Sequence, residues 1–201
     1  MKQDKEIRNL QAEHKVEGNH ITGYCIRFNE QSEYLGFYEV IEPSAVSQEL
    51  LERSNVMCLF NHDPDKVLGR SLNGKGNLKL TLDKQGVRYD CELLNNELAN
   101  TVRSYIDAGL ITTSSFAFTV AQGDDAQVWK RNADGSLHRT IKKIDGIFDC
   151  SPVWDAAYST TSCSCRSLDK FLEEEKRNKE EEDKLQAEYQ EFLDKIEKLE
   201  E

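Results

Sequence analysis

The chain has 201 residues, of which 38% are hydrophobic and 31% are charged, and its formal net charge is −11. This length suits one globular domain with an appendage, and such a domain can bury a core without disulfide staples. The negative charge excludes a general nucleic-acid binder, which needs a basic face to replace phosphate counterions. No apolar run approaches the roughly 20 residues of a membrane span, so we expect no membrane partner.

Six cysteines are present, and four of them lie inside apolar runs, where cysteine behaves as a small buried hydrophobe. These four are Cys25, Cys58, Cys91 and Cys150. The polar beginning of the chain carries no signal-peptide segment, so we expect a cytosolic protein with reduced thiols. The remaining pair, Cys163 and Cys165, has no second pair or nearby histidine to complete a zinc site. The sequence therefore predicts neither a metal nor a cofactor.

The chain begins with a polar lead-in over residues 1–18 that has little core content, and the folded domain is predicted over residues 19–166. Its first strands are expected at Ile21–Phe28 and Tyr38–Ile41. A helix is predicted from Ser44, as a candidate N-cap, to about Glu52.

The middle of the domain is predicted to contain further strands and one helix. Strands are predicted at Asn55–Asn61 and Val67–Leu72, and alternating apolar residues on both sides of Asp83–Gly86 predict a hairpin. A helix follows from Asn96 to Ala108, with Gly109 suited to the left-handed closing position.

The last predicted elements are a strand at Ile111–Val120, a hairpin around Asn132–Gly135 and a closing strand at Ile147–Val153. Short strands at this density favour an α+β domain that is mainly an antiparallel, barrel-like sheet with a few flanking helices.

Residues 167–201 form an acidic tail with 14 acidic and 7 basic residues. Apolar residues recur there at helical a/d spacing: Leu185, Tyr189, Phe192, Ile196 and Leu199. The seam is shorter than the about three to four heptads that identify a coiled coil. The tail is therefore predicted to be a helix, either solvated and alone, or paired in a short coiled coil or with a docking partner.

His62 is the leading candidate for a general base, since histidine most often serves this purpose near neutral pH. It follows the apolar run Val56–Phe60 and opens a polar turn, and functional groups often occupy such strand ends. The other histidines lie in less informative places, with His14 expected in solvent and His138 on the second hairpin.

The strand at residues 111–120 offers a candidate nucleophile. Because strand side chains alternate between faces, Ser114 shares the core face with Phe116 and Phe118, where we expect its hydroxyl to bind backbone. Ser115 lies on the opposite face, which is small and polar and which a substrate backbone could approach. On residue type alone this is equally a serine- and threonine-rich strand half facing water.

A nucleophilic serine needs a base, and the base needs a group that fixes its tautomer. Asp149 is the first candidate for that third group, because it interrupts an apolar run between Phe148 and Cys150. His138 is the alternative third member.

The order of these segments resembles the prohead serine proteases of tailed bacteriophages, which are related in fold to the herpesvirus assembly proteases. The matching segments are Gly23–Asn29, Glu39–Val46, Leu59–Asp63 with Leu68–Arg70, Gly109–Ile111 with Ser115–Phe118, and Asp149–Val153 with Ala156–Tyr158. Three sites depart from the family pattern: Ala117 stands where glycine is usual, Thr113–Ser114 where a glycine and a hydrophobic residue are usual, and Ala156 where proline is usual.

The resemblance implies a serine endopeptidase with Ser115 as nucleophile, His62 as base and Asp149 or a second histidine as the orienting group. Backbone N–H groups near Ser115 or the Arg70 guanidinium are the candidate oxyanion donors. It also implies the major capsid protein, the scaffold protein and the protease itself as substrates, in the host cytoplasm inside the assembling prohead. A homodimer is suggested by analogy, and the tail could hold the protease in the shell. The competing interpretations are an inactive relative that binds capsid or scaffold, and a coiled-coil scaffolding protein.

Overall fold

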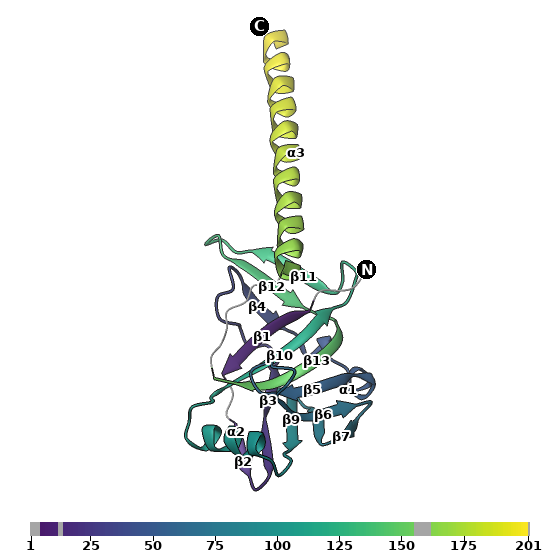
Figure 1. Cartoon of the computed structure of the whole chain (residues 1–201). Helices are drawn as coiled ribbons and strands as arrows, with labels where there is room; N and C mark the ends of the chain where they lie inside the picture. Colours follow the sequence, from purple (N-terminus) through teal and green to yellow (C-terminus); the bar gives the residue numbers. More distant parts are fainter. Residues whose placement is uncertain (1–4, 12–13, 155–161, 201) are drawn as a thin grey trace. The chain divides into compact units, whose positions relative to one another are not determined.

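The computed structural model describes residues 5–11, 14–154 and 162–200, and the chain divides into two compact units, residues 1–163 and 164–201 (Figure 1). The elements of the first unit are β1 (Glu6–Gln11), β2 (Lys15–Glu17), β3 (His20–Arg27), β4 (Tyr38–Ile41), the 3-10 turn η1 (Pro43–Ala45), α1 (Gln48–Arg53), β5 (Asn55–Leu59), β6 (Val67–Leu72), β7 (Lys75–Gly76), β8 (Leu78–Leu82), β9 (Gly86–Glu92), α2 (Glu97–Asp107), β10 (Thr113–Val120), β11 (Gln127–Arg131), β12 (Leu137–Ile141) and β13 (Ile144–Val153).

The described strands form three open sheets rather than a closed barrel. One sheet has the order β1-β10-β13-β5-β6-β7, a second β11-β12-β4, and a third β2-β3-β9-β8. Most pairs are antiparallel, but β13 pairs with β5 and β12 with β4 in parallel. The prediction of a strand-rich α+β domain is confirmed, whereas the barrel-like closure is not observed, because each sheet ends in two edge strands.

One apolar core holds the sheets together, and the helix α2 contributes Val102 and Ile106 to it. The first four cysteines also lie in this core as free thiols, none of them exposed. Their predicted place as small buried hydrophobes is therefore confirmed. The side chains of Cys163 and Cys165 lie outside the described residues.

Local capping chemistry sets the bounds of the helices. Asn96 caps α2 by accepting the Ala99 N–H at 2.8 Å, and Gly109 closes it with a φ of +70°, as predicted. The prediction that Ser44 caps the earlier helix is wrong. Pro43 begins a separate 3-10 turn, and Ser47 caps α1 by accepting the Leu50 N–H.

The N-terminal residues differ from the predicted polar lead-in, because they contribute the strands β1 and β2. β1 is the edge strand of the six-stranded sheet and pairs antiparallel with β10 over its whole length. Glu6 and Arg8 on this strand are buried, with 0% and 5% of their surface exposed. Their ionic partners lie on distant strands, so the sequence around them gives no sign of burial.

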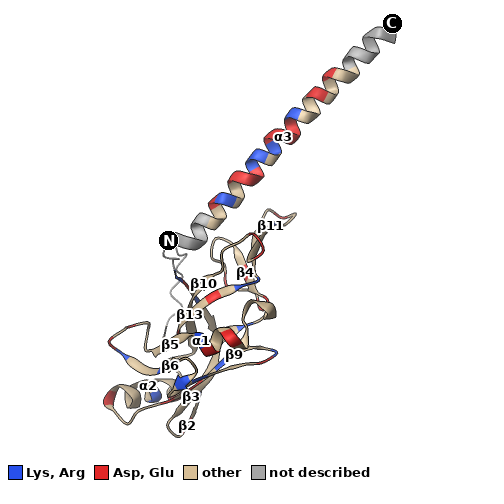
Figure 2. Ribbon diagram, turned by 90° about the vertical axis from the view of Figure 1, so that its right-hand side faces the viewer, with Lys and Arg blue, Asp and Glu red and all other residues tan. Residues whose placement is uncertain are grey.

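The second unit is the helix α3 (Ser162–Glu200), as predicted for the tail. Lys and Glu four residues apart support it at Lys170–Glu174, Lys176–Glu180 and Lys184–Glu188, and Figure 2 shows both signs of charge along its length. The seam residues Leu185, Tyr189 and Phe192 are exposed, while the side chains of Ile196 and Leu199 lie outside the described residues. Pairing of this seam in a coiled coil stays a prediction. No described helix is both long and apolar enough to span a membrane.

Candidate active site

Three neighbouring strands of the six-stranded sheet bring Ser115, Asp149 and His62 together. Ser115 lies in the middle of β10, Asp149 lies in the adjacent strand β13, and His62 follows β5 on the other side of β13. The register pairs Ser115 with Ser151 and Ala117 with Asp149, so these four side chains share one face of the sheet.

Hydrogen bonds connect the three residues in a row. His62 Nδ1 lies 2.6 Å from Asp149 Oδ2, and His62 Nε2 lies 2.6 Å from Ser115 Oγ. With a neutral imidazole, Nδ1–H donates to the carboxylate and Nε2 is left to accept the serine proton. A nucleophile, a base and a tautomer-fixing carboxylate in this order are the components of an acyl-transfer triad.

A turn of left-handed backbone carries His62 over the sheet. Asn61 has a φ of 55° and His62 a φ of 57°, a conformation that costs about 1–2 kcal/mol for each residue other than glycine. The Asn61 N–H donates to Pro152 O at 3.2 Å, and Asn61 Oδ1 accepts the Trp154 N–H at 3.2 Å. These two bonds tie the turn to the end of β13, and backbone strain held in place by such contacts is typical of functional sites.

Ser151 is a residue of the site that the sequence analysis missed. Its hydroxyl donates to Asp149 Oδ1 and accepts the Leu59 N–H at 3.2 Å. The Asp149 carboxylate is therefore held through one oxygen by Ser151 and through the other by His62. The sequence signal that could have identified Ser151 is its position two residues after Asp149, which places both side chains on the same face of one strand.

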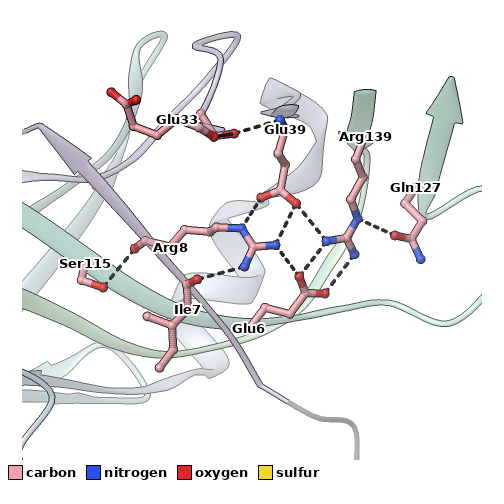
Figure 3. Close-up of polar contacts among 9 residues, drawn as sticks. Glu6, Ile7, Arg8, Glu33, Glu39, Ser115, Gln127 and Arg139 are labelled. Carbon is pink, nitrogen blue, oxygen red and sulfur yellow. Dashed lines mark hydrogen bonds and ion pairs between the residues drawn. The ribbon is translucent and has the colours of Figure 1, made fainter. Parts of the chain in front are cut away.

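The face of β10 that carries Ser115 is covered, which differs from the predicted open face. Ser115 is 0% exposed, and β1 pairs with β10 along its edge, with Asn9 opposite Ser115 in the register. The Ser115 hydroxyl lies 3.0 Å from the Arg8 carbonyl oxygen, which can accept its proton (Figure 3). His62 keeps 24% of its side chain exposed.

The other candidates lie elsewhere. Ser114 is on the opposite face, as predicted, but its hydroxyl lies 3.4 Å from the Tyr89 hydroxyl, rather than on backbone. The His138 ring packs against Tyr38 in the three-stranded sheet, whereas Asp149 is the residue that contacts His62 Nδ1. Arg70 Nε donates to Asn55 at an exposed position.

The prediction that His14 lies in solvent is wrong. Its Nε2–H donates to the Thr113 carbonyl at 3.0 Å, and its Nδ1 accepts from the Tyr89 hydroxyl at 2.8 Å. Burial lowers the pKa of His14, which agrees with the neutral form that these two bonds require. Within the described part of the chain, no group of three or more His, Cys, Asp or Glu side chains could hold a metal ion.

Known proteins resemble this chain in sequence family and in fold. The family model described as caudovirus prohead serine protease matches residues 5–174. The solved structure of the capsid assembly protease of bacteriophage T4 is similar, with a TM-score of 0.51 and 9% sequence identity over 75% of this chain and 97% of that one. No curated protein matches the chain. The likeness to the T4 structure concerns the fold, while the family match covers most of the sequence. The chain therefore belongs to the caudovirus prohead serine protease family.

Proposed function

We propose that this chain is a serine endopeptidase of prohead maturation, in which Ser115 is the nucleophile, His62 the general base and Asp149 the group that orients His62. The row of hydrogen bonds from Ser115 through His62 to Asp149, 2.6 Å at each step, is the observation that carries this proposal. Membership of the family supports the same chemistry.

The proposed reaction is acyl transfer to water. Ser115 Oγ attacks the scissile carbonyl while its proton passes to His62 Nε2, and Asp149 stabilises the imidazolium through Nδ1–H. The C–N bond then breaks as His62 gives the proton to the leaving amine, and water releases the acyl group by the same route in reverse. Loss of the serine or the histidine from such a unit typically costs about 10⁶ in turnover.

The proposed substrates are the major capsid protein, the scaffold protein and the protease itself, inside the assembling prohead in the host cytoplasm. The T4 protein of similar fold is a capsid assembly protease, which supports this class of substrate. We also propose that α3, which is charged and leaves Leu185 and Tyr189 exposed, retains the protease in the shell by helix pairing or joins two copies in a homodimer.

Coexpression with the major capsid protein tests the enzymatic proposal. We expect defined fragments of capsid protein, or of the protease itself, by intact-mass spectrometry with the wild type. Ser115→Ala and His62→Ala should give none. Ser114→Ala is the matched control, because Ser114 is equally buried on the same strand but faces away from His62, and it should cleave like the wild type. Cleavage that persists in Ser115→Ala would show that the nucleophile lies elsewhere.

The second candidate function is an inactive assembly module that binds capsid or scaffold through the same fold. Two observations favour it: Ser115 is fully buried, and Ala117 stands where the family usually has glycine. Under this alternative the wild type stays intact and leaves coexpressed capsid protein uncut, while still copurifying with it.

A further inference from the structure

An extended segment of the chain itself lies beside the proposed nucleophile. β1 adds to the edge of β10 as an antiparallel strand with six register pairs, from Glu6 opposite Phe118 to Gln11 opposite Thr113. The Ser115 hydroxyl reaches the Arg8 carbonyl at 3.0 Å, and no surface of Ser115 remains exposed. A substrate that added to the edge of β10 as an extended strand would take the place of β1 and bring a main-chain carbonyl to this same point.

The charged side chains of β1 bind to a receptor, by which we mean the pair Glu39 and Arg139 on other strands. Register places Glu6 and Arg8 on the face of β10 away from Ser115, where Glu39 of β4 and Arg139 of β12 form a buried, register-paired couple. Arg8 binds both oxygens of Glu39, at 2.7 and 3.0 Å. Glu6 binds both terminal nitrogens of Arg139, at 2.6 and 2.9 Å (Figure 3). Both contacts are bidentate, the geometry that gives such pairs their specificity.

The charges of Glu39 and Arg139 balance each other when β1 is absent. Glu39 and Arg139 contact each other at 2.9 Å, so withdrawal of β1 removes one buried negative and one buried positive charge and leaves a matched pair. A buried charge without its partner is strongly destabilising, whereas the removal of a neutral pair avoids that penalty. Burial opposes ionisation of Glu6, but Arg139 and Arg8 outweigh it and hold the pKa of Glu6 below its ordinary value. β1 is thus held by two ion pairs, one from Glu6 to Arg139 and one from Arg8 to Glu39.

The Arg8 carbonyl also competes for the proton on which catalysis depends. The Ser115 hydroxyl has one hydrogen, and both His62 Nε2 and the Arg8 oxygen lie within hydrogen-bond distance of Oγ. When the hydrogen points to Arg8, His62 cannot accept it, and the oxygen of Ser115 is not activated. β1 therefore occupies the edge of β10 beside Ser115 and offers its hydroxyl proton a second acceptor.

We infer that β1 occupies the edge of β10 at which an extended substrate binds, and that Glu39 and Arg139 are the specificity-determining residues of that site. They select an extended segment with an acidic and a basic side chain two positions apart, whose second residue presents its carbonyl to Ser115. The inference rests on the proposed function, since it names the substrate class of the same site.

Labelling of Ser115 by a fluorophosphonate in the full-length chain tests this inference. In the labelling step Ser115 Oγ forms a bond to phosphorus, the P–F bond breaks, fluoride leaves and the hydroxyl proton passes to His62. We expect the double variant Glu6→Ala with Arg8→Ala to label at least tenfold faster than the wild type. Lys15→Ala with Glu17→Ala is the matched control, because it removes an equally spaced, exposed pair of opposite charges from β2, and its rate should equal that of the wild type.

A synthetic peptide of residues 5–11 tests the receptor without any change to it. Added to the Glu6→Ala, Arg8→Ala variant, this peptide should slow labelling back towards the wild-type rate, and the same peptide with alanine at both charged positions should not. Equal effects of the two peptides, or a folded double variant that labels no faster than the control, would overturn the inference. If no form labels above the Ser115→Ala background, the proposed function itself fails.

Hydrogen exchange on the wild type keeps the inference testable if the double variant does not fold. Phosphonylated Ser115 carries a group in the place of the Arg8 carbonyl, so the amides of β1 should exchange at least tenfold faster after labelling, while those of β8 and β9 stay unchanged. Unchanged protection of β1 in the labelled protein would contradict the inference.

Discussion

Replacement of Asp149 by asparagine should switch the tautomer of His62 while the site keeps its shape. The asparagine Nδ2–H₂ can donate to His62 Nδ1, which places the ring hydrogen on Nε2, where it donates to Ser115 Oγ. The Ser115 hydroxyl then donates to the Arg8 carbonyl at 3.0 Å, and Ser151 still donates to the side-chain oxygen at position 149. The groups of His62, Ser115 and Ser151 that bond within the site each keep a partner in this wrong tautomer, so the site does not oppose it.

The opposite orientation of the introduced amide is excluded by its hydrogen bonds, since its NH₂ group would then face Ser151 and leave a buried hydroxyl without an acceptor, at a cost of about 1–3 kcal/mol. We therefore expect Asp149→Asn to lower kcat by about 10⁴, the loss typical of a triad with the wrong tautomer, with little change in stability. Cleavage of a coexpressed capsid protein followed by mass spectrometry gives the rate, and denaturant unfolding gives the stability. A loss below tenfold in a folded variant would refute this account of the third residue.

Three further predictions concern the support of the site and the fold. Ser151→Ala removes one of the two restraints on Asp149 and leaves a main-chain N–H of β5 unpaired, so we expect a loss of about 1–3 kcal/mol in unfolding free energy and a lower kcat at unchanged KM. Ser151→Thr, which keeps the hydroxyl, should recover most of both, and equal rates for the two variants would contradict this role. Because the pKa of Glu6 is lowered in the folded state, its contribution to stability is fully present above its ordinary value of 4.5 and is lost as pH falls through the lowered pKa. The stability difference between wild type and Glu6→Gln in urea titrations should therefore shrink on acidification below 4.5, and a pH-independent difference would argue against an ionised Glu6. Asn96→Ala should cost about 1 kcal/mol by loss of the cap of α2, whereas Asn95→Ala, one residue outside it, should stay within about 0.5 kcal/mol in the same assay.

The parts of the fold that could be predicted depend on chemistry within a few residues. Asn96 begins α2 and Gly109 ends it, because an N-cap and a glycine in the left-handed conformation each affect only the adjacent turn of the helix. Strand alternation separated Ser115 from Ser114 for the same reason, since it depends only on the strand itself. The misplaced cap at Ser44 shows the limit even at short range, because Pro43 turned the chain once before α1 began.

The parts that could not be predicted depend on partners far away in the sequence. Glu6 and Arg8 lie in a polar segment that by composition would be exposed. Their burial depends on ion pairs with Arg139 and Glu39, which lie 133 and 31 residues away in the sequence. The parallel contact of β13 with β5, which places Asp149 beside the turn of His62, leaves no local pattern either. Ser115, His62 and Asp149 were therefore open to prediction as candidates, but Ser151 and the strand beside Ser115 were not predicted.

The arrangement of β10, β13 and β5 also fixes when hydrolytic chemistry can arise during synthesis. β13 lies between the other two strands in the sheet, yet it is the last strand of the described first unit to leave the ribosome. His62 and Ser115 are 53 residues apart and His62 and Asp149 are 87 apart, and such non-local pairings form late in folding. A nascent chain that already displays the serine and the histidine still lacks both the carboxylate and the strand that joins them. On the proposed function, translation thus imposes a delay of its own, because the proposed triad is assembled only after nearly the whole first unit has been made.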